Sequence, residues 1–455
     1  MPEDDLSKAP TDPAEEEPQK EEPPFTFSWG IVMIRTRKLL SALDWLARFR
    51  IFADIGWAFL GITLAAAGFM LYLMLDQTYI LLTGSLALRC AVGAAPPSQC
   101  AQNNLPTTSA PPVQSYLLLP GINPYIPVIY GLIGIIIAVV VHEGTHGVIA
   151  RRLKLPVKST GVLLLLIIPI GAFVEIDEKL IQKARFRDSG RIMAGGPGSN
   201  IIVSLIALAL LLLLVGGLVP IQYNGTSLNG VSAQSIVPGS PADGLHMEHH
   251  LYAGDVIVAA NGTSVDSVNA LGSYLLTTHP NQTLMLSVEH QGVINNYSIV
   301  LAKNPDPNAT QGFIGIGDLS TVSTSGVKTQ YASSFFTRPI LYLIVPGIIS
   351  QANSIVPFSS SLHWLYTSPQ LGFAWYPVAL TLFWIWFINV NLAFFNAIPL
   401  YPLDGGQAML NFFSHFGRPG VEKRAKALTT VISLLMLAII LSFLLLPRIL
   451  GMIPY

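Results

Sequence analysis

Five long apolar runs, separated by polar and basic segments, dominate the pattern of this 455-residue chain. They cover residues 51–75, 123–150, 192–221, 374–398 and 427–447. An α-helix needs about 20 apolar residues to cross the hydrocarbon core of a bilayer, and each run is of that order. The pattern predicts a polytopic α-helical membrane protein.

Two shorter apolar runs do not fit a simple crossing. Residues 159–176 contain Pro169 and Gly171 and have basic residues on both sides, which favours a re-entrant hairpin. Residues 338–358 contain two prolines, and this segment either lies in the membrane interface or forms a hairpin. We therefore expect about six membrane segments plus a re-entrant hairpin.

Basic residues mark one side of the membrane. They flank the ends of the long runs that share one face: Arg35, Arg37, Lys38, Arg48 and Arg50, then Arg151, Arg152 and Lys154, and finally Arg418, Lys423, Arg424 and Lys426. By the positive-inside rule these segments are cytoplasmic, as is the N-terminus. Residues 222 to about 335 then lie outside the cell, in a multi-pass protein of the cell membrane.

Composition agrees with this interpretation. With 51% hydrophobic and 11% charged residues, the chain is not an ordinary soluble protein. The net charge of -1 speaks against nucleic acid as a partner. Cys90 and Cys100 form one short disulfide if their loop faces an oxidising compartment, and two unpaired thiols are the equally weighted alternative.

The resulting domain division has seven parts. They are a disordered acidic tail (1–24), a basic segment with the first transmembrane helix (25–76), an extracytoplasmic loop (77–122), the first part of the membrane core (123–221), an extracytoplasmic β-rich domain (222–303), a linker with an interfacial or re-entrant segment (304–372), and the second part of the membrane core (373–455).

The motif His-Glu-Gly-Thr-His stands at the cytoplasmic end of the second span. His142 and His146 are four residues apart, so a helix places both imidazoles on one face, where they can bind Zn²⁺. Glu143 then lies beside the open coordination position as a general base. Ionisable residues are costly inside a membrane and mark function by default.

A catalytic zinc usually has three protein ligands and a water molecule. Asp404 is the intramembrane acid at the same predicted depth, after the span 374–398, where prolines and paired glycines break the helix. The local alternative is an Asp that caps the following helix.

Three asparagines at similar depth are weaker candidates for substrate positioning or oxyanion stabilisation: Asn200, Asn391 and Asn396. Asn200 ends the sequence GGPGSN, whose small residues also favour close helix packing, and all three amides alternatively join helices by hydrogen bonds.

The motifs HEGTH, GPGSN and NAIPLYPLDGG, in this order and at this depth, resemble those of the site-2 protease family of intramembrane zinc metalloproteases, peptidase family M50. The resemblance implies zinc as the cofactor, His142, His146 and Asp404 as its ligands, and Glu143 as the base. It implies transmembrane protein substrates, cut within the bilayer, and a hairpin at 159–176 that pairs with an unwound substrate by strand addition.

The outer insert carries a second resemblance. Ser235–Ala242 and Ala253–Gly262 are similar to the turn and strand signature of PDZ domains, which predicts a peptide added as a strand beside residues 228–231. A module that only keeps bulky substrates away is the alternative.

Two other function classes remain open from the residues alone. A metal carrier would use the same ligands for transit, but it needs no base beside the metal. An inactive peptide-binding scaffold has no reason to keep three ionisable groups in the bilayer.

Overall fold

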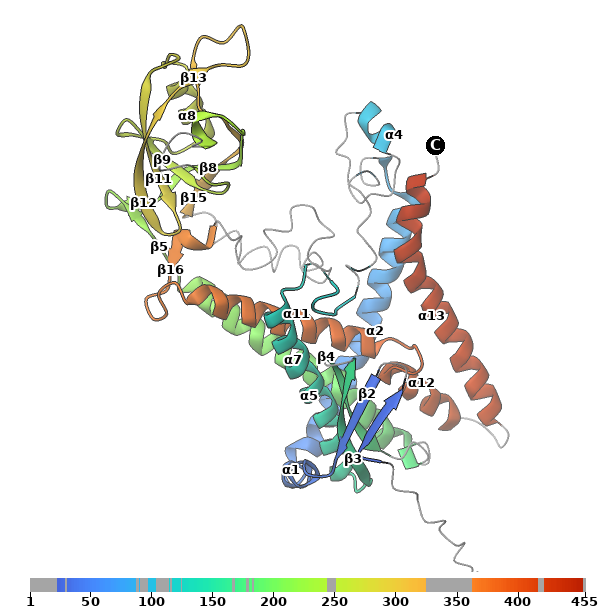
Figure 1. Ribbon diagram of the computed structural model, residues 1–455. Coiled ribbons are helices and arrows are strands. Elements are labelled where there is room, and N and C mark those ends of the chain that lie inside the picture. The colour runs from blue at the N-terminus through green and yellow to red at the C-terminus, as the bar shows by residue number, and fades with distance from the viewer. Residues whose placement is uncertain are drawn as a thin grey trace, which may run out of the picture.

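The computed structural model places five long helices, two β-sheets of four and six strands, and several short elements (Figure 1). It describes residues 23–28, 31–86, 90, 97–103, 114, 117–123, 125–165, 168–176, 180–181, 184–243, 251–324, 362–415 and 421–452. Most of the predicted acidic tail and the predicted interfacial segment 338–358 lie outside the described residues.

Five helices of the described part are long and apolar enough to cross a membrane. They are α2 (Ile51–Thr83), α5 (Val128–Arg152), α7 (Phe186–Gly216), α11 (Trp375–Ala397) and α13 (Val421–Met452). Each coincides with one of the five predicted long runs. The chain is thus a multi-pass membrane protein with a β-rich region, and the five strong spans are confirmed as helices.

Helices α5, α7 and α11 form the centre of the helical part. They pack against one another, and α2 lies against α7. The core between them is aromatic, since Trp375, Trp384 and Phe387 of α11 are all fully buried. The shorter helix α12 (Asp404–His415) follows α11 and contacts both α7 and α13.

Glycines let the central helices approach closely. A Cβ atom added at Gly134 of α5 would lie 2.9 Å from the backbone oxygen of Trp384, and one at Gly198 of α7 would lie 2.5 Å from the Phe59 side chain. Such small-residue contacts are the usual means of close packing between membrane helices, because lipid supplies no hydrophobic drive for association.

An antiparallel four-stranded sheet lies at one end of these helices, beside α1 (Leu40–Leu46) (Figure 1). Its order is β1 (Phe25–Ser28), β2 (Ile31–Thr36), β3 (Val157–Leu165) and β4 (Ile168–Ile176). The predicted re-entrant hairpin is thus a β-hairpin. The interpretation of residues 25–76 had no strands in it; β1 and β2 form because Ile31–Thr36 pairs with β3, more than 120 residues later in the chain.

The second β-rich region lies at the opposite end of α7 and α11 (Figure 1). Its main sheet has the order β12-β11-β9-β8-β15, with β10 (Thr263–Ser264) paired to β9. These strands are β8 (Asn229–Ile236), β9 (Val256–Ala260), β11 (Thr283–His290), β12 (Val293–Val300) and β15 (Ile316–Ser323), and one helix, α8 (Val268–Leu275), packs against it.

Two sequence-based predictions for this region are wrong. The predicted boundary at residue 303 leaves out β15, although β15 pairs with β8 along its whole length. The predicted site for an added peptide strand beside residues 228–231 is also occupied, because β8 has β15 on one side and β9 on the other. Sequence alone misplaced this edge, since β15 reaches β8 from about 80 residues away.

A short two-stranded connection and a shared core join the two parts. β16 (Tyr366–Thr367) pairs with β5 (Val219–Pro220), and the indole of Trp375 donates a hydrogen bond of 2.9 Å to the carbonyl oxygen of Tyr366.

A disulfide joins Cys90 to Cys100 of α4 (Pro97–Gln102). Of the two alternatives for these cysteines, the structure therefore has the disulfide rather than two free thiols.

One buried acid makes the stability of the six-stranded sheet depend on pH. Glu289 of β11 is 1% exposed, and its Oε1 accepts a hydrogen bond from the backbone N–H of Gly292. Burial raises the pKa of the Glu289 carboxyl to about 7, and the negative charge of Asp255 adds to this effect.

A raised acid pKa stabilises the folded state below the unfolded value and costs stability as pH rises through the folded value. We expect the sheet to lose about 3 kcal/mol between pH 4.5 and pH 8, and Glu289→Gln to abolish this slope. The opening free energy of β11 amides, measured by hydrogen exchange in the full chain, checks this. An exposed acid, Asp266→Asn, is the control, and an unchanged slope in Glu289→Gln would contradict the expectation.

Candidate metal centre

Helix α5 presents the first two candidate ligands and the candidate base. His142 and His146 are 5% and 6% exposed, and their ring centroids are 4.9 Å apart. The i, i+4 spacing therefore acts as predicted, with both imidazoles on the same buried face of the helix.

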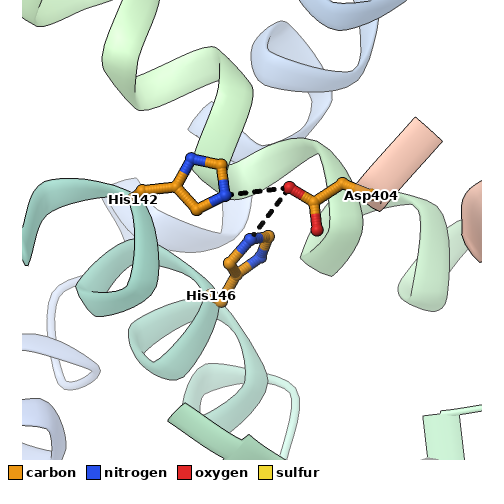
Figure 2. Close-up of side chains that lie close together, drawn as sticks. All are labelled: His142, His146 and Asp404. Carbon is orange, nitrogen blue, oxygen red and sulfur yellow. Dashed lines mark ion pairs between the residues drawn. The ribbon is translucent and has the colours of Figure 1, made fainter. Parts of the chain in front are cut away.

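Asp404 comes to these histidines from the start of α12 (Figure 2). Its Oδ2 atom lies 2.9 Å from Nε2 of His142 and 3.3 Å from Nε2 of His146. Asp404 is the first residue of the helix rather than the cap residue before it, and its carboxylate faces the two imidazoles.

The paired glycines after Asp404 make this approach sterically possible. A Cβ atom at Gly405 would lie 2.3 Å from the carbonyl oxygen of Ala397, and one at Gly406 would lie 2.2 Å from the backbone nitrogen of Tyr401. Contacts this short do not occur between real atoms, so only glycine lets α12 begin directly under the end of α11.

Groups of α7 hold the far side of each imidazole. Nδ1 of His146 lies 2.6 Å from the carbonyl oxygen of Ile192, and because a carbonyl only accepts, Nδ1 carries the proton. The Asn200 amide lies 3.2 Å from Nδ1 of His142, and its Oδ1 atom has no other hydrogen-bond partner. Exchanging the amide's oxygen and nitrogen lets Oδ1 accept from Nδ1–H, so that both Nε2 atoms are free to act as ligands.

These contacts give a direct test of whether a metal fits. Neutral His146, protonated at Nδ1, directs its Nε2 lone pair towards a carboxylate oxygen, which is repulsive unless a proton or a metal ion lies between them. The ligand atoms of His142, His146 and Asp404 all lie within 4.8 Å of one another. A buried group of two imidazoles and one carboxylate is a donor set that zinc uses in hydrolytic enzymes.

Gly196 of α7 lies against the two imidazoles. A Cβ atom at this position would lie 2.5 Å from Nε2 of both His142 and His146. The neighbouring Gly195 approaches α5 as well, since a Cβ atom there would lie 2.9 Å from the Ile149 side chain. The absence of side chains at Gly195 and Gly196 therefore allows the close contact between α5 and α7.

Glu143 lies between the histidines in sequence and contacts the four-stranded sheet. Its Oε2 atom accepts a hydrogen bond of 3.1 Å from the backbone N–H of Val174 in β4. The base candidate is thus held by the hairpin that the sequence placed at the membrane.

The three asparagine candidates differ in their surroundings. Asn200 contacts a candidate ligand, as described above. The Nδ2 atoms of Asn391 and Asn396 instead donate to carbonyl oxygens of their own helix, those of Phe387 and Leu392, at 2.8 and 3.0 Å. Contact with a substrate stays a prediction for all three residues.

Sequence reasoning did not find Gly196, the Ile192 carbonyl or the Val174 amide. The first had a signal, because it lies in the GGPGSN motif, but a glycine gives no indication of the side chains it faces. The other two contribute backbone atoms, so the identities of their side chains do not indicate this role.

Gly196→Ala tests the close approach. The added methyl group must displace at least one imidazole, so we expect zinc affinity to fall by about a hundredfold or more. Gly190→Ala is the matched control in the same helix, because the nearest atoms to its Cβ would be 3.7 Å away. Zinc titration of both purified variants checks this, and equal affinity in the two would show that Gly196 does not set the site.

Comparison with known proteins agrees with this geometry. Residues 130–440, more than half of the chain, match the description Peptidase family M50. An uncharacterised protein of Methanocaldococcus jannaschii is 26% identical over 82% of this chain and 75% of its own length. The zinc metalloprotease RasP of Shouchella clausii is 25% identical over 47% of this chain and 48% of its own length, so the chain spans about half of that relative. With a family match of this extent over the helices that carry the site, the chain belongs to peptidase family M50.

Proposed function

We propose that this protein is a zinc metalloprotease of the site-2 type, which hydrolyses peptide bonds in or near transmembrane segments of other proteins. The observation that carries the proposal is the convergence of His142, His146 and Asp404, with Glu143 beside them, on helices that are long and apolar enough to cross a membrane. The family match supports a protease, and the position of the ligands supports a substrate within the bilayer.

The residues divide the chemistry between them. Zinc held by the two histidines and Asp404 would polarise the scissile carbonyl and lower the pKa of a water molecule. Glu143 accepts the proton of that water and later donates it to the nitrogen of the leaving amine. Asn200 and the Ile192 carbonyl hold the imidazole rings by their Nδ1 atoms, so the ligands keep their orientation through the reaction.

The substrate must be locally unwound. A helix hides its carbonyl groups in hydrogen bonds from residue i to i+4, and an intact transmembrane helix offers none for attack. β4 is an edge strand of the four-stranded sheet and contacts α5 near Glu143, which supports the proposal that an unwound segment pairs with it.

The orientation we propose has the zinc site towards the cytoplasm and the β-rich region outside. Arg151 and Arg152 at the end of α5 lie on the side of the site, as does Arg50 just before α2. The Cys90–Cys100 disulfide follows the other end of α2, and disulfides persist in oxidising compartments. Charge and disulfide therefore support the same direction.

A peptide partner of the outer PDZ-like domain, if it has one, is expected at β15 rather than at β8. β15 is an edge strand of its sheet, and α8 lies against it, with the Val268 N–H donating to Oγ1 of Thr321. An edge strand beside a helix suits the addition of an extended peptide. A module that only excludes bulky substrates remains the alternative.

Loss of the general base and loss of the third ligand should differ in their effects on zinc content and cleavage rate. We expect Glu143→Gln to keep its zinc and to cut a transmembrane substrate at least about a hundredfold more slowly, because proton transfer is lost. Asp404→Ala is expected to lose zinc as well as activity, since it removes a ligand. Elemental analysis and cleavage assays on the same preparations check both.

Replacement of an exposed acid on α2, Asp54→Asn, is the control for loss of a negative charge. Normal zinc binding with no cleavage that depends on Glu143, for any substrate tested, would instead favour a carrier or a scaffold.

The β15 assignment makes a separate prediction. Adding extended peptides with apolar C-termini to the full chain should slow hydrogen exchange in residues 316–323 and leave the opposite edge strand β12 unchanged, because only the β15 edge adjoins α8. Protection confined to β12, or no binding at all, would support a module that excludes substrates.

A further inference from the structure

The hydrogen bond between Glu143 and Val174 links the candidate base to the strand proposed to hold the substrate. Val174 is opposite Thr160 of β3 in the antiparallel ladder. In an antiparallel edge strand, the N–H groups of successive residues point alternately towards the neighbouring strand and away from it. The Val174 N–H reaches Glu143, so it points away from β3. It belongs to the row of groups that an added strand would use.

The contact between strand and helix is sterically fixed. A Cβ atom at Gly147, the residue after His146, would lie 3.2 Å from the Val174 side chain and 2.8 Å from that of Leu43. β4 therefore lies directly on the turn of α5 that carries the site. A substrate strand on this edge would pass the metal ligands at the same level as Glu143.

One N–H makes one strong hydrogen bond at a time. A substrate carbonyl that pairs with Val174 must take the place of the Glu143 carboxylate, because both acceptors need the same N–H direction. The Val174 N–H also fixes the direction of the Glu143 carboxylate, which keeps its other lone pairs as acceptors. Pairing of a substrate at the strand edge therefore changes how the base is oriented.

We propose that the Val174 N–H is a latch that holds Glu143 at rest and releases it when an extended substrate segment pairs with β4. This inference rests on the proposed function and adds its regulation. Full activity then requires a segment that is both unwound and paired with the strand, which protects intact transmembrane helices and short peptides that do not reach β4. Val174 is a positioning residue, which acts through Glu143.

A static contact is the alternative, in which the same N–H orients Glu143 throughout the reaction. The two differ in what happens when the N–H is lost. A latch restrains the base, so its removal speeds the hydrolysis of peptides too short to pair with β4. A static positioning contact helps the base, so its removal slows the hydrolysis of every substrate.

Hydrogen exchange of the Val174 amide in the full, zinc-loaded chain tests the contact without reference to catalysis. Glu143→Ala removes the acceptor and should speed exchange by about tenfold or more, whereas Glu143→Gln keeps an acceptor oxygen and should restore protection. The Phe173 amide, which alternation directs towards β3, is the control within the same strand. A blocked peptide of twelve Leu, Ala and Gly residues should protect Val174 again in Glu143→Ala.

The second arm replaces the Val174 peptide amide by an ester, which removes the N–H and keeps the side chain. We expect the rate on a four-residue peptide to rise several-fold and kcat/KM for a transmembrane substrate to fall. The same ester at Thr26, in the far edge strand β1, controls for weakening of the sheet. A fall on both substrates, or Val174 exchange that is unchanged in Glu143→Ala, would overturn the latch.

The two proposals fail in different ways. If the wild type hydrolyses no substrate while the exchange pattern holds, the protease proposal fails, and the competition for Val174 stands as a ligand-dependent contact. If hydrolysis depends on Glu143 while exchange at Val174 does not, the protease stands and the latch fails.

Discussion

Three acceptor atoms that repel one another share a small buried volume, and the surrounding structure depends on this constraint. Nε2 of His142 and of His146 point at the same oxygen of Asp404, in a region where water does not screen their repulsion. A metal ion among them, or a proton between an imidazole and the carboxylate, removes this repulsion. Neighbouring groups serve the same end, because the Ile192 carbonyl and Asn200 hold the remaining imidazole nitrogens and leave no choice of orientation.

Close approach of backbones builds this volume. Gly196 brings α7 against the two imidazoles, while Gly405 and Gly406 bring the start of α12 under the end of α11. At each of these positions the absence of a side chain lets two helices come close together, and the surrounding helices enclose the site. The site is therefore a property of the packing of α5, α7, α11 and α12, rather than of any one segment.

The sequence predicts a structural feature well when the residues that form it lie close together in the chain. The five spans and the His142, His146 pair depend on residues close together in the chain, and the structure has the expected helices and the shared face. Asp404 was found across 258 residues only because membrane depth restricts the candidates. Strands β1, β2 and β15 were missed since their partners are distant, and Ile192 and Val174 contribute backbone atoms that no side chain reveals.

The four-stranded sheet shows why the base and the strand edge belong together. One row across the sheet, Phe25, Ile34 and Val162, is apolar and exposed, as expected of a surface that faces lipid. The open edge of a sheet cannot face lipid in the same way, because lipid cannot accept hydrogen bonds from the amides of the edge strand. The outward amide of Val174 must find an acceptor within the protein or on a substrate, and Glu143 is the acceptor that it has. In the proposed arrangement, with this edge strand at membrane depth, Glu143 accepts from the Val174 amide at rest and a substrate carbonyl accepts from it during binding.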